Sequence, residues 1–145
     1  MVDEHAGADP MDTLKPVSDA AKITELIETV RRVDLSPDVK RYAVELVSST
    51  RRLPEIRIGA SPRSTLHLVR AARAQAALAG RDFVVPDDLH AVAIPVLAHR
   101  LVLTAEAQAG RRSSAELIRG LVQRVPVPQG ALDPTAQWVQ PTRRR

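Results

Sequence analysis

The stretch SPRSTLHLVRAARAQAALAG, residues 61–80, predicts the helix around which the rest of the chain is organised. Ser61 followed by Pro62 is typical of a helix start, because proline fits the first helical position, and Gly80 is typical of a helix end. We therefore expect a helix from Pro62 to Ala79. Its small alanine side chains allow other helices to approach closely. The side that we expect to face the core carries Leu66, Val69 and Ala76.

Two further helices are expected downstream. One begins at Pro86, with Asp87 and Asp88 in its first turn, where carboxylates favour the helix dipole. We expect a kink or break near Ala91–Pro95, because proline lacks the N–H that a helix interior needs. The buried side of this helix is expected to carry Leu89, Val92, Val96 and Leu97. The last helix starts with a capping box formed by Ser113 and Glu116 and ends before Pro126 and Pro128. Its apolar face consists of Leu117, Ile118, Leu121, Val122 and Val125.

Two helices are expected upstream. The nearer one opens with Ser36 as the N-cap, followed by Pro37 and Asp38. Its core-facing stripe consists of Val39, Tyr42, Ala43, Leu46 and Val47. The first helix, SDAAKITELIETVRRV, is expected to use Ser18 as its cap. Its apolar residues at helical spacing are Ile23, Leu26, Ile27, Val30 and Val33, so we place it in the same bundle.

The composition supports an all-α fold. The 145 residues are 44% hydrophobic but include only one Phe, one Tyr and one Trp, so the core must consist of Leu, Val, Ile and Ala. Such a core favours packed helices over a sheet. We expect a bundle of about five helices over residues 17–126, after an extended lead-in (residues 1–16). A disordered C-terminal tail (residues 127–145) contains Trp138. Residues 50–60 are expected to form a loop with an extended piece at Ile56–Ile58, and residues 101–110 a connector with a short strand at Leu101–Leu103.

Several classes of protein are excluded by simple counts. The absence of cysteine excludes disulfides and cysteine-ligated metal sites. No apolar run reaches membrane-spanning length and no signal peptide is apparent, so we expect a cytoplasmic protein without membrane contact. The net charge of +4 permits an anionic partner, although Arg143–Arg145 supply much of it. The near absence of aromatic residues argues against direct binding of nucleic acid.

No catalytic motif is present. The sequence lacks the GxxxxGK[ST], HExxH and GxSxG patterns. The four histidines have no metal-ligand spacing, and we expect surface or second-layer roles for His5, His67, His90 and His99. Asp87 and Asp88 are interpreted as helix caps and not as an acid/base pair.

Arg63 is the residue whose position calls for an explanation. A cation in the first turn of a helix is mildly unfavourable, because the helix N-terminus already carries partial positive charge. Arg63, His67 and Arg70 share one face, which is either a solvated polar stripe or part of an anion site. An anion at Arg63 would meet free backbone N–H groups, the helix dipole and a guanidinium together. Arg51 and Arg52 are interpreted as solvent-exposed loop arginines.

A family resemblance favours the anion site. Blocks in the same order as in the family are LKPV (Leu14–Val17), VDLSPDVKRYAVELV (Val33–Val47), TR (Thr50–Arg51), GASPR (Gly59–Arg63), RAARA (Arg70–Ala74), GRDFVVPDD (Gly80–Asp88), VLAHR (Val96–Arg100) and LIRGLVQRVPVP (Leu117–Pro128). Over residues 13–128 the chain resembles the C-terminal lid region of the MoxR family of AAA+ ATPases. Val85 departs from the pattern, since the family usually has a capping Thr there.

The resemblance implies a role for Arg63 and for the intact protein. Arg63 matches the sensor 2 arginine, which is directed toward the γ-phosphate of the nucleotide. No cofactor is expected in this fragment, whereas ATP and Mg are expected in the intact, chaperone-like ATPase. The implied partners are the N-terminal nucleotide-binding AAA+ domain of the same protein, the neighbouring subunits of a ring oligomer and von Willebrand factor A-domain proteins.

The chain itself is not expected to be an enzyme. The Walker motifs of the nucleotide-binding domain are missing, so we expect an excised lid with its natural C-terminus and regard Met1 as an artificial start. Two other interpretations stay open. One is a free-standing helical interaction adaptor, and the other is a basic helical DNA-binding domain.

Overall fold

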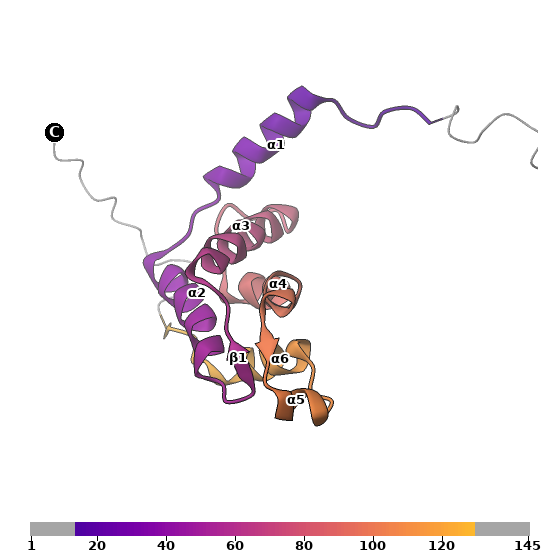
Figure 1. Cartoon of the computed structure of the whole chain (residues 1–145). Helices are drawn as coiled ribbons and strands as arrows, with labels where there is room; N and C mark the ends of the chain where they lie inside the picture. Colours follow the sequence, from indigo (N-terminus) through magenta and orange to yellow (C-terminus); the bar gives the residue numbers. More distant parts are fainter. Residues whose placement is uncertain (1–13, 130–145) are drawn as a thin grey trace, which may run out of the picture.

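The structure, a computed structural model, describes residues 14–129 (Figure 1). The expected all-α class is confirmed, since these residues form six α-helices, two short 3-10 helices and one small two-stranded sheet. In chain order the elements are α1 (Ala20–Arg32), α2 (Pro37–Ser49), η3 (Thr50–Arg52), β1 (Ile56–Ile58), α3 (Pro62–Leu78), α4 (Pro86–Leu97), η4 (Ala98–Arg100), β2 (Val102–Leu103), α5 (Ala105–Ala109) and α6 (Ser114–Arg124). Met1, His5, Trp138, Arg143–Arg145 and the outer parts of the expected lead-in and tail lie outside the described residues.

α2 begins and packs as its sequence predicts. The Ser36 hydroxyl accepts a hydrogen bond from the backbone N–H of Val39 at 3.2 Å, and Pro37 opens the helix. All five residues of the predicted stripe are buried, namely Val39, Tyr42, Ala43, Leu46 and Val47. α2 therefore forms one wall of the core, against α3, α4 and α6.

α3 lies against both α2 and α4 and ends at the predicted glycine. Gly80 adopts a φ of 72°, a conformation that glycine reaches without strain. The N–H of Gly80 donates to the carbonyl of Ala77 at 3.0 Å, and the N–H of Arg81 donates to that of Ala76 at 2.9 Å. These two bonds form a Schellman motif, which satisfies the last carbonyls of the helix.

Of the kink or break predicted near Ala91–Pro95, the break is wrong. The helix continues through Pro95 to Leu97 and only then changes to the 3-10 turn η4. Pro95 and Ala91, whose carbonyl loses its helical partner at the proline, are both exposed, so water can replace the missing hydrogen bond. The opposite side of the helix is anchored in the core by Leu89, Ala93 and Leu97.

The extended segments predicted on either side of α3 and α4 pair with each other. β1 and β2 run antiparallel, with Ile56 opposite Leu103 and Ile58 opposite Val102 across an irregular register. The connector after β2 also contains a helix that the sequence analysis missed, α5, whose first turn is capped by the Thr104 hydroxyl. α6 follows with the predicted capping box of Ser113 and Glu116, and buries Leu117, Ile118 and Leu121.

α1 differs most from expectation. Its N-cap is Asp19 and not Ser18, because the Asp19 carboxylate accepts a hydrogen bond from the N–H of Lys22 at 2.8 Å. More importantly, α1 contains no buried residue, although a core-facing stripe was predicted. The helix extends away from the body formed by α2, α3, α4 and α6 (Figure 1). It contacts α3, and the core begins only after it, at Val33 and Leu35.

The segment between α1 and α2 is held firmly. Asp34 donates its N–H to the carbonyl of Asp82 at 2.7 Å, and its own carbonyl accepts from the N–H of Val84 at 3.0 Å. This bridge joins the α1–α2 connection to the α3–α4 connection. The C-terminal end of α1 is therefore fixed to the body.

None of the helices formed by residues 14–129 has both the length and the apolar character that crossing a membrane requires.

Candidate functional site

Arg63 lies at the open end of α3, as its second residue. Ser61, two residues before Arg63, has an extended backbone (φ −73°, ψ 160°), and its hydroxyl accepts no hydrogen bond from a backbone N–H of the helix. The first turn closes through the N–H of Ser64, which donates to the Ser61 carbonyl at 2.8 Å. Arg63 is exposed and forms no salt bridge with any carboxylate of residues 14–129. Its guanidinium is therefore available to an anion.

The predicted polar face of α3 is present, but one predicted core residue is wrong. Arg63 and Arg70 are exposed and His67 is half-buried. Leu66 is 59% exposed, because the core side of α3 follows a spacing of four residues that leaves it out. The residues on that side are Ser64, Leu68, Ala72 and Ala76.

The segment before α3 is held by residues that follow α2. The side chain of Thr50 is fully buried, and its hydroxyl donates to the Val47 carbonyl at 2.6 Å. The same oxygen accepts the backbone N–H of Ala60 at 2.9 Å. Arg51 donates from Nη1 to the Ala60 carbonyl at 2.7 Å. Thr50 and Arg51 thus satisfy both backbone groups of Ala60, three residues before Arg63.

Gly59 completes this arrangement because it leaves no space for a side chain. A Cβ atom built on Gly59 would lie 2.5 Å from Cγ of Arg51 and 2.9 Å from the Arg51 backbone nitrogen. The two backbones therefore meet in direct contact. We refer to Thr50, Arg51, Gly59 and Ala60 as the loop clamp. It holds the segment immediately before α3, the helix that carries Arg63.

Arg51 and Arg52 were interpreted as solvent-exposed loop arginines. Both are exposed, but both also form specific contacts within the fold. Arg51 belongs to the loop clamp and also donates to the Ser48 hydroxyl at 3.1 Å. Arg52 donates to the Ser49 hydroxyl at 2.6 Å and forms an ion pair with Glu45. The clamp residues belong to two separate family blocks, TR and GASPR. The two blocks lie about ten residues apart in the sequence, and no periodic pattern predicts that they are in contact.

Asp87 and Asp88 behave as the predicted helix-start carboxylates, with Asp88 as the structural one. Asp88 is buried and accepts the N–H of Val85 at 2.8 Å, and its own N–H donates to the Val85 carbonyl at 3.0 Å, so the first turn of α4 closes without a capping hydroxyl. Asp88 also accepts from both terminal nitrogens of Arg81, at 2.8 and 2.5 Å. Burial alone would raise the pKa of Asp88, but the bonds from Arg81 and Val85 and the Arg81 charge outweigh it and lower the pKa. Asp87 is almost fully exposed.

The three histidines in the described range, His67, His90 and His99, are not grouped as a metal site. His90 Nε2 and the hydroxyl of Tyr42 are hydrogen-bonded at 2.7 Å, and burial lowers the pKa of His90 although nearby Asp87 opposes this. His67 and His99 lie on other elements. Within the described part of the chain, no three histidine or acidic side chains are grouped so that they could hold a metal ion.

Comparison with known proteins identifies the fold. The AAA lid domain family matches residues 48–121, just over half of the chain. The match includes the loop clamp, Arg63 and the Arg81–Asp88 pair, and it leaves out α1.

Three relatives of this chain are longer proteins. The uncharacterized protein YeaC of Bacillus subtilis (strain 168) is 36% identical over 82% of this chain and 37% of its own length. Chaperone MoxR1 of Mycobacterium tuberculosis is 41% identical over 61% of this chain and 26% of its own length. Protein MoxR of Paracoccus denitrificans is 38% identical over 64% of this chain and 32% of its own length. The chain thus spans little more than a third of these relatives at most.

A solved structure agrees with the sequence relatives. The crystal structure of a candidate ATPase from Cytophaga hutchinsonii superimposes with a TM-score of 0.67 and 31% identity, over 70% of this chain and 34% of that one. The family match, the sequence relatives and the solved structure lead to one conclusion. The chain belongs to the AAA lid domain family and is a lid of the MoxR type.

Proposed function

We propose that this lid serves an ATP-hydrolysing protein of the MoxR type and that Arg63 is its sensor 2 arginine. The observation that carries the proposal is the placement of Arg63. It is exposed in the first turn of α3, without a carboxylate partner among residues 14–129, on a segment held by the loop clamp. A cation placed there is unfavourable for the helix alone and becomes favourable when an anion is bound.

The chemistry follows from charge and geometry. The γ-phosphate carries negative charge that redistributes during transfer, and a positioned guanidinium stabilises that charge through two parallel N–H donors. Because the clamp joins Arg63 to the body of the lid, a contact with phosphate would also set the orientation of the whole lid. Lid orientation would then depend on the nucleotide that is bound.

The remaining parts of the ATP site must come from elsewhere in the protein. Phosphoryl transfer needs a phosphate-binding loop, a carboxylate that holds Mg and a positioned water, and residues 14–129 contain no group of acidic and histidine side chains that could hold the metal. We propose that the nucleotide-binding AAA+ domain of the same protein supplies them, with neighbouring subunits of a ring oligomer. One relative is named a chaperone, which supports work on protein clients. Proteins with von Willebrand factor A-domains are the proposed partners.

Substitution of Arg63 in the full-length ATPase tests the assignment. Arg63→Ala should lower turnover at saturating ATP about a hundredfold, which corresponds to about 3 kcal/mol of lost transition-state stabilisation. Arg63→Lys should restore only part of it, because an ammonium cannot reproduce the guanidinium fork. Arg119→Ala is the matched control, because Arg119 is also an exposed helical arginine, on α6, and should leave turnover unchanged.

The isolated 145-residue chain separates function from folding. Arg63→Ala should leave its thermal unfolding unchanged or slightly raise its stability, since a cation is removed from the positive end of α3. We expect no ATP hydrolysis by this chain alone. Wild-type turnover of Arg63→Ala in a correctly assembled oligomer would show that Arg63 is not the sensor.

A further inference from the structure

The apolar face of α1 is ordered but uncovered. Ile23, Leu26 and Ile27 are 48%, 59% and 48% exposed. A helix of 13 residues is marginal in water by itself, and most helices in proteins are stabilised by packing of their apolar face. Covering a large aliphatic side chain contributes on the order of 1.5–3 kcal/mol when the burial is complete. α1 therefore carries a surface suited to a partner.

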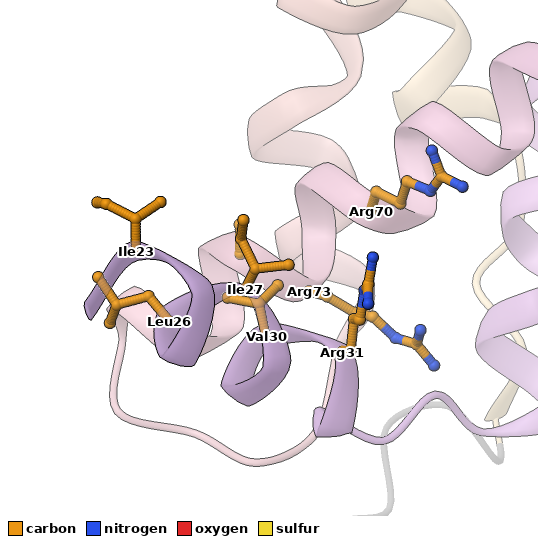
Figure 2. A pocket seen from close by; sticks show the side chains of 8 residues that line it. Ile23, Leu26, Ile27, Val30, Arg31, Arg70 and Arg73 are labelled. Atoms are coloured by element: carbon orange, nitrogen blue, oxygen red, sulfur yellow. The ribbon is translucent and has the colours of Figure 1, made fainter. Parts of the chain in front are cut away.

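This surface forms one wall of a groove of about 660 Å³ (Figure 2). The α1 wall consists of Ile23, Leu26, Ile27 and Val30, and the α3 wall includes Arg70 and Arg73. The close-up shows these two arginines on α3, on the side of the C-terminal end of α1, whereas Ile23 and Leu26 lie toward the N-terminal end of α1. The groove is thus apolar along α1 and cationic along α3. We refer to it as the α1–α3 groove.

The two α3 cations of the groove, Arg70 and Arg73, lack acidic partners among the described residues. Neither Arg70 nor Arg73 forms a salt bridge with a residue in the described range, and Nε of Arg73 is buried without a hydrogen-bond acceptor. Arg31, which also lines the groove, is paired only with Glu28 of its own helix. An occupant that brings carboxylates to this side would complete these groups, and one that brings cations would be repelled.

A second copy of the chain does not meet this requirement. Helical spacing places Lys22 and Arg31 on the two edges of the apolar face of α1. The same spacing places Glu25 and Glu28 on the opposite side of the helix. Two α1 helices packed face to face would therefore bring cations toward cations. Charge complementarity favours a different helix, apolar on one face and acidic along its edge.

We propose that the α1–α3 groove binds an amphipathic, acidic-edged helix from the nucleotide-binding part of the intact protein. The source of the helix rests on the proposed function, whereas its chemistry rests on the groove. α1 lies outside residues 48–121, the part that the lid family matches, whereas Arg70 and Arg73 lie inside it, so the groove spans the border of the matched region. The relatives also extend far beyond the matched region, which covers 26–37% of their length. An interface at this border would couple the lid to the domain that binds ATP.

Peptides test the chemistry on the isolated chain. The probes are two amphipathic peptides of about 18 residues, long enough for five helical turns. Both carry the same leucine stripe, flanked by glutamates in one and by lysines in the other. Fluorescence anisotropy should show the glutamate peptide binding about tenfold more tightly or better. Ile27→Asp should abolish this binding, and Arg70→Glu combined with Arg73→Glu should reverse the preference.

Leu78→Asp provides the matched control. Leu78 is an exposed leucine on α3 that does not line the groove, so its substitution should leave binding unchanged. Absence of binding, or equal affinity for both peptides, would overturn the proposal. It would also be overturned by a concentration-dependent dimer that Ile27→Asp dissociates, or by α1-dependent binding to phosphatidylserine vesicles in preference to the glutamate peptide. The dimer would make the occupant a second copy, and vesicle binding would make it a membrane surface.

The intact ATPase tests the source of the helix. Ile27→Asp should make the lid unfold in a separate, earlier transition and should speed proteolysis around residues 14–19, whereas Arg63→Ala should do neither. If Ile27→Asp changes neither measurement while Arg63→Ala abolishes turnover, the docking proposal fails and the sensor proposal stands. If the lid separates as expected but Arg63→Ala retains full turnover, the reverse holds.

Discussion

Thr50 holds the segment that leads to Arg63, and its hydroxyl can be removed without changing the shape of the side chain. In Thr50→Val, the Val47 carbonyl keeps a partner, because it also accepts the backbone N–H of residue 50. The N–H of Ala60, which is fully buried, loses the only acceptor that it has among the described residues. An unsatisfied buried N–H costs about 1–3 kcal/mol, and the lost bonds add about 1 kcal/mol. We therefore expect Thr50→Val to lower the free energy of unfolding by about 2–4 kcal/mol.

Urea unfolding of the 145-residue chain, followed by far-UV circular dichroism, measures this change by linear extrapolation. The thermal midpoint should fall by roughly 10 °C for a domain of this size. Thr50→Ser is the matched control. It keeps the hydroxyl and loses one methyl group, so it should cost only about 1 kcal/mol.

Hydrogen exchange locates the effect. In the wild-type chain the Ala60 amide should be protected, and in Thr50→Val it should exchange by local opening while the amides of α2 remain protected. If Thr50→Val and Thr50→Ser differ by less than 0.5 kcal/mol (roughly the smallest net value of a hydrogen bond) and Ala60 stays protected, the hydroxyl does not hold this segment, and the reasoning is refuted.

Three further outcomes are expected from neighbouring features. Asp88→Ala should lower the free energy of unfolding, measured in urea, by about 3 kcal/mol. The substitution breaks the buried ion pair with Arg81 and removes the acceptor of the Val85 N–H at the start of α4. The loss should be smaller than for a fully buried pair, because Arg81 is partly exposed. Asp87→Ala, the exposed control, should cost less than about 1 kcal/mol, and equal losses for the two variants would contradict this assignment. The pKa of Asp88 is lower in the folded state than in the unfolded state. Its contribution to the free energy of unfolding is therefore complete above the unfolded pKa of about 4 and is lost as the pH falls through the folded pKa. The difference in the free energy of unfolding between the wild-type chain and Asp88→Ala should then vanish in acid. Gly59→Ala should cost about 1–3 kcal/mol in the same assay, since the new methyl group meets the Arg51 backbone, and a neutral effect would mean that the loop clamp is not closely packed.

The sequence alone predicted the features that are encoded within one or two helical turns. Ser36, the Ser113–Glu116 capping box and Gly80 mark helix ends correctly, because a cap and the amide or carbonyl that it satisfies lie within about four residues of each other. The buried stripe of α2 was predicted for the same reason. The ordered blocks around GASPR identified the lid family, which the comparisons confirm.

Predictions failed where the outcome depended on other elements. The period of α1 shows that one of its faces is apolar, but it does not show whether this chain supplies the cover, and in this structure the face stays open. The expected break at Pro95 is absent because Leu89, Ala93 and Leu97 anchor α4 on its other side. Leu66 fits a helical period yet lies outside the face that meets α2 and α4.

The candidate site combines both kinds of information. The sequence alone predicted that Arg63 is in the first turn of a helix, where a cation without an anion is mildly unfavourable. Only the tertiary structure decided that Thr50 and Arg51 hold the segment before it. That contact joins residues about ten positions apart, and it depends on the packing of η3 against β1, which no local pattern specifies.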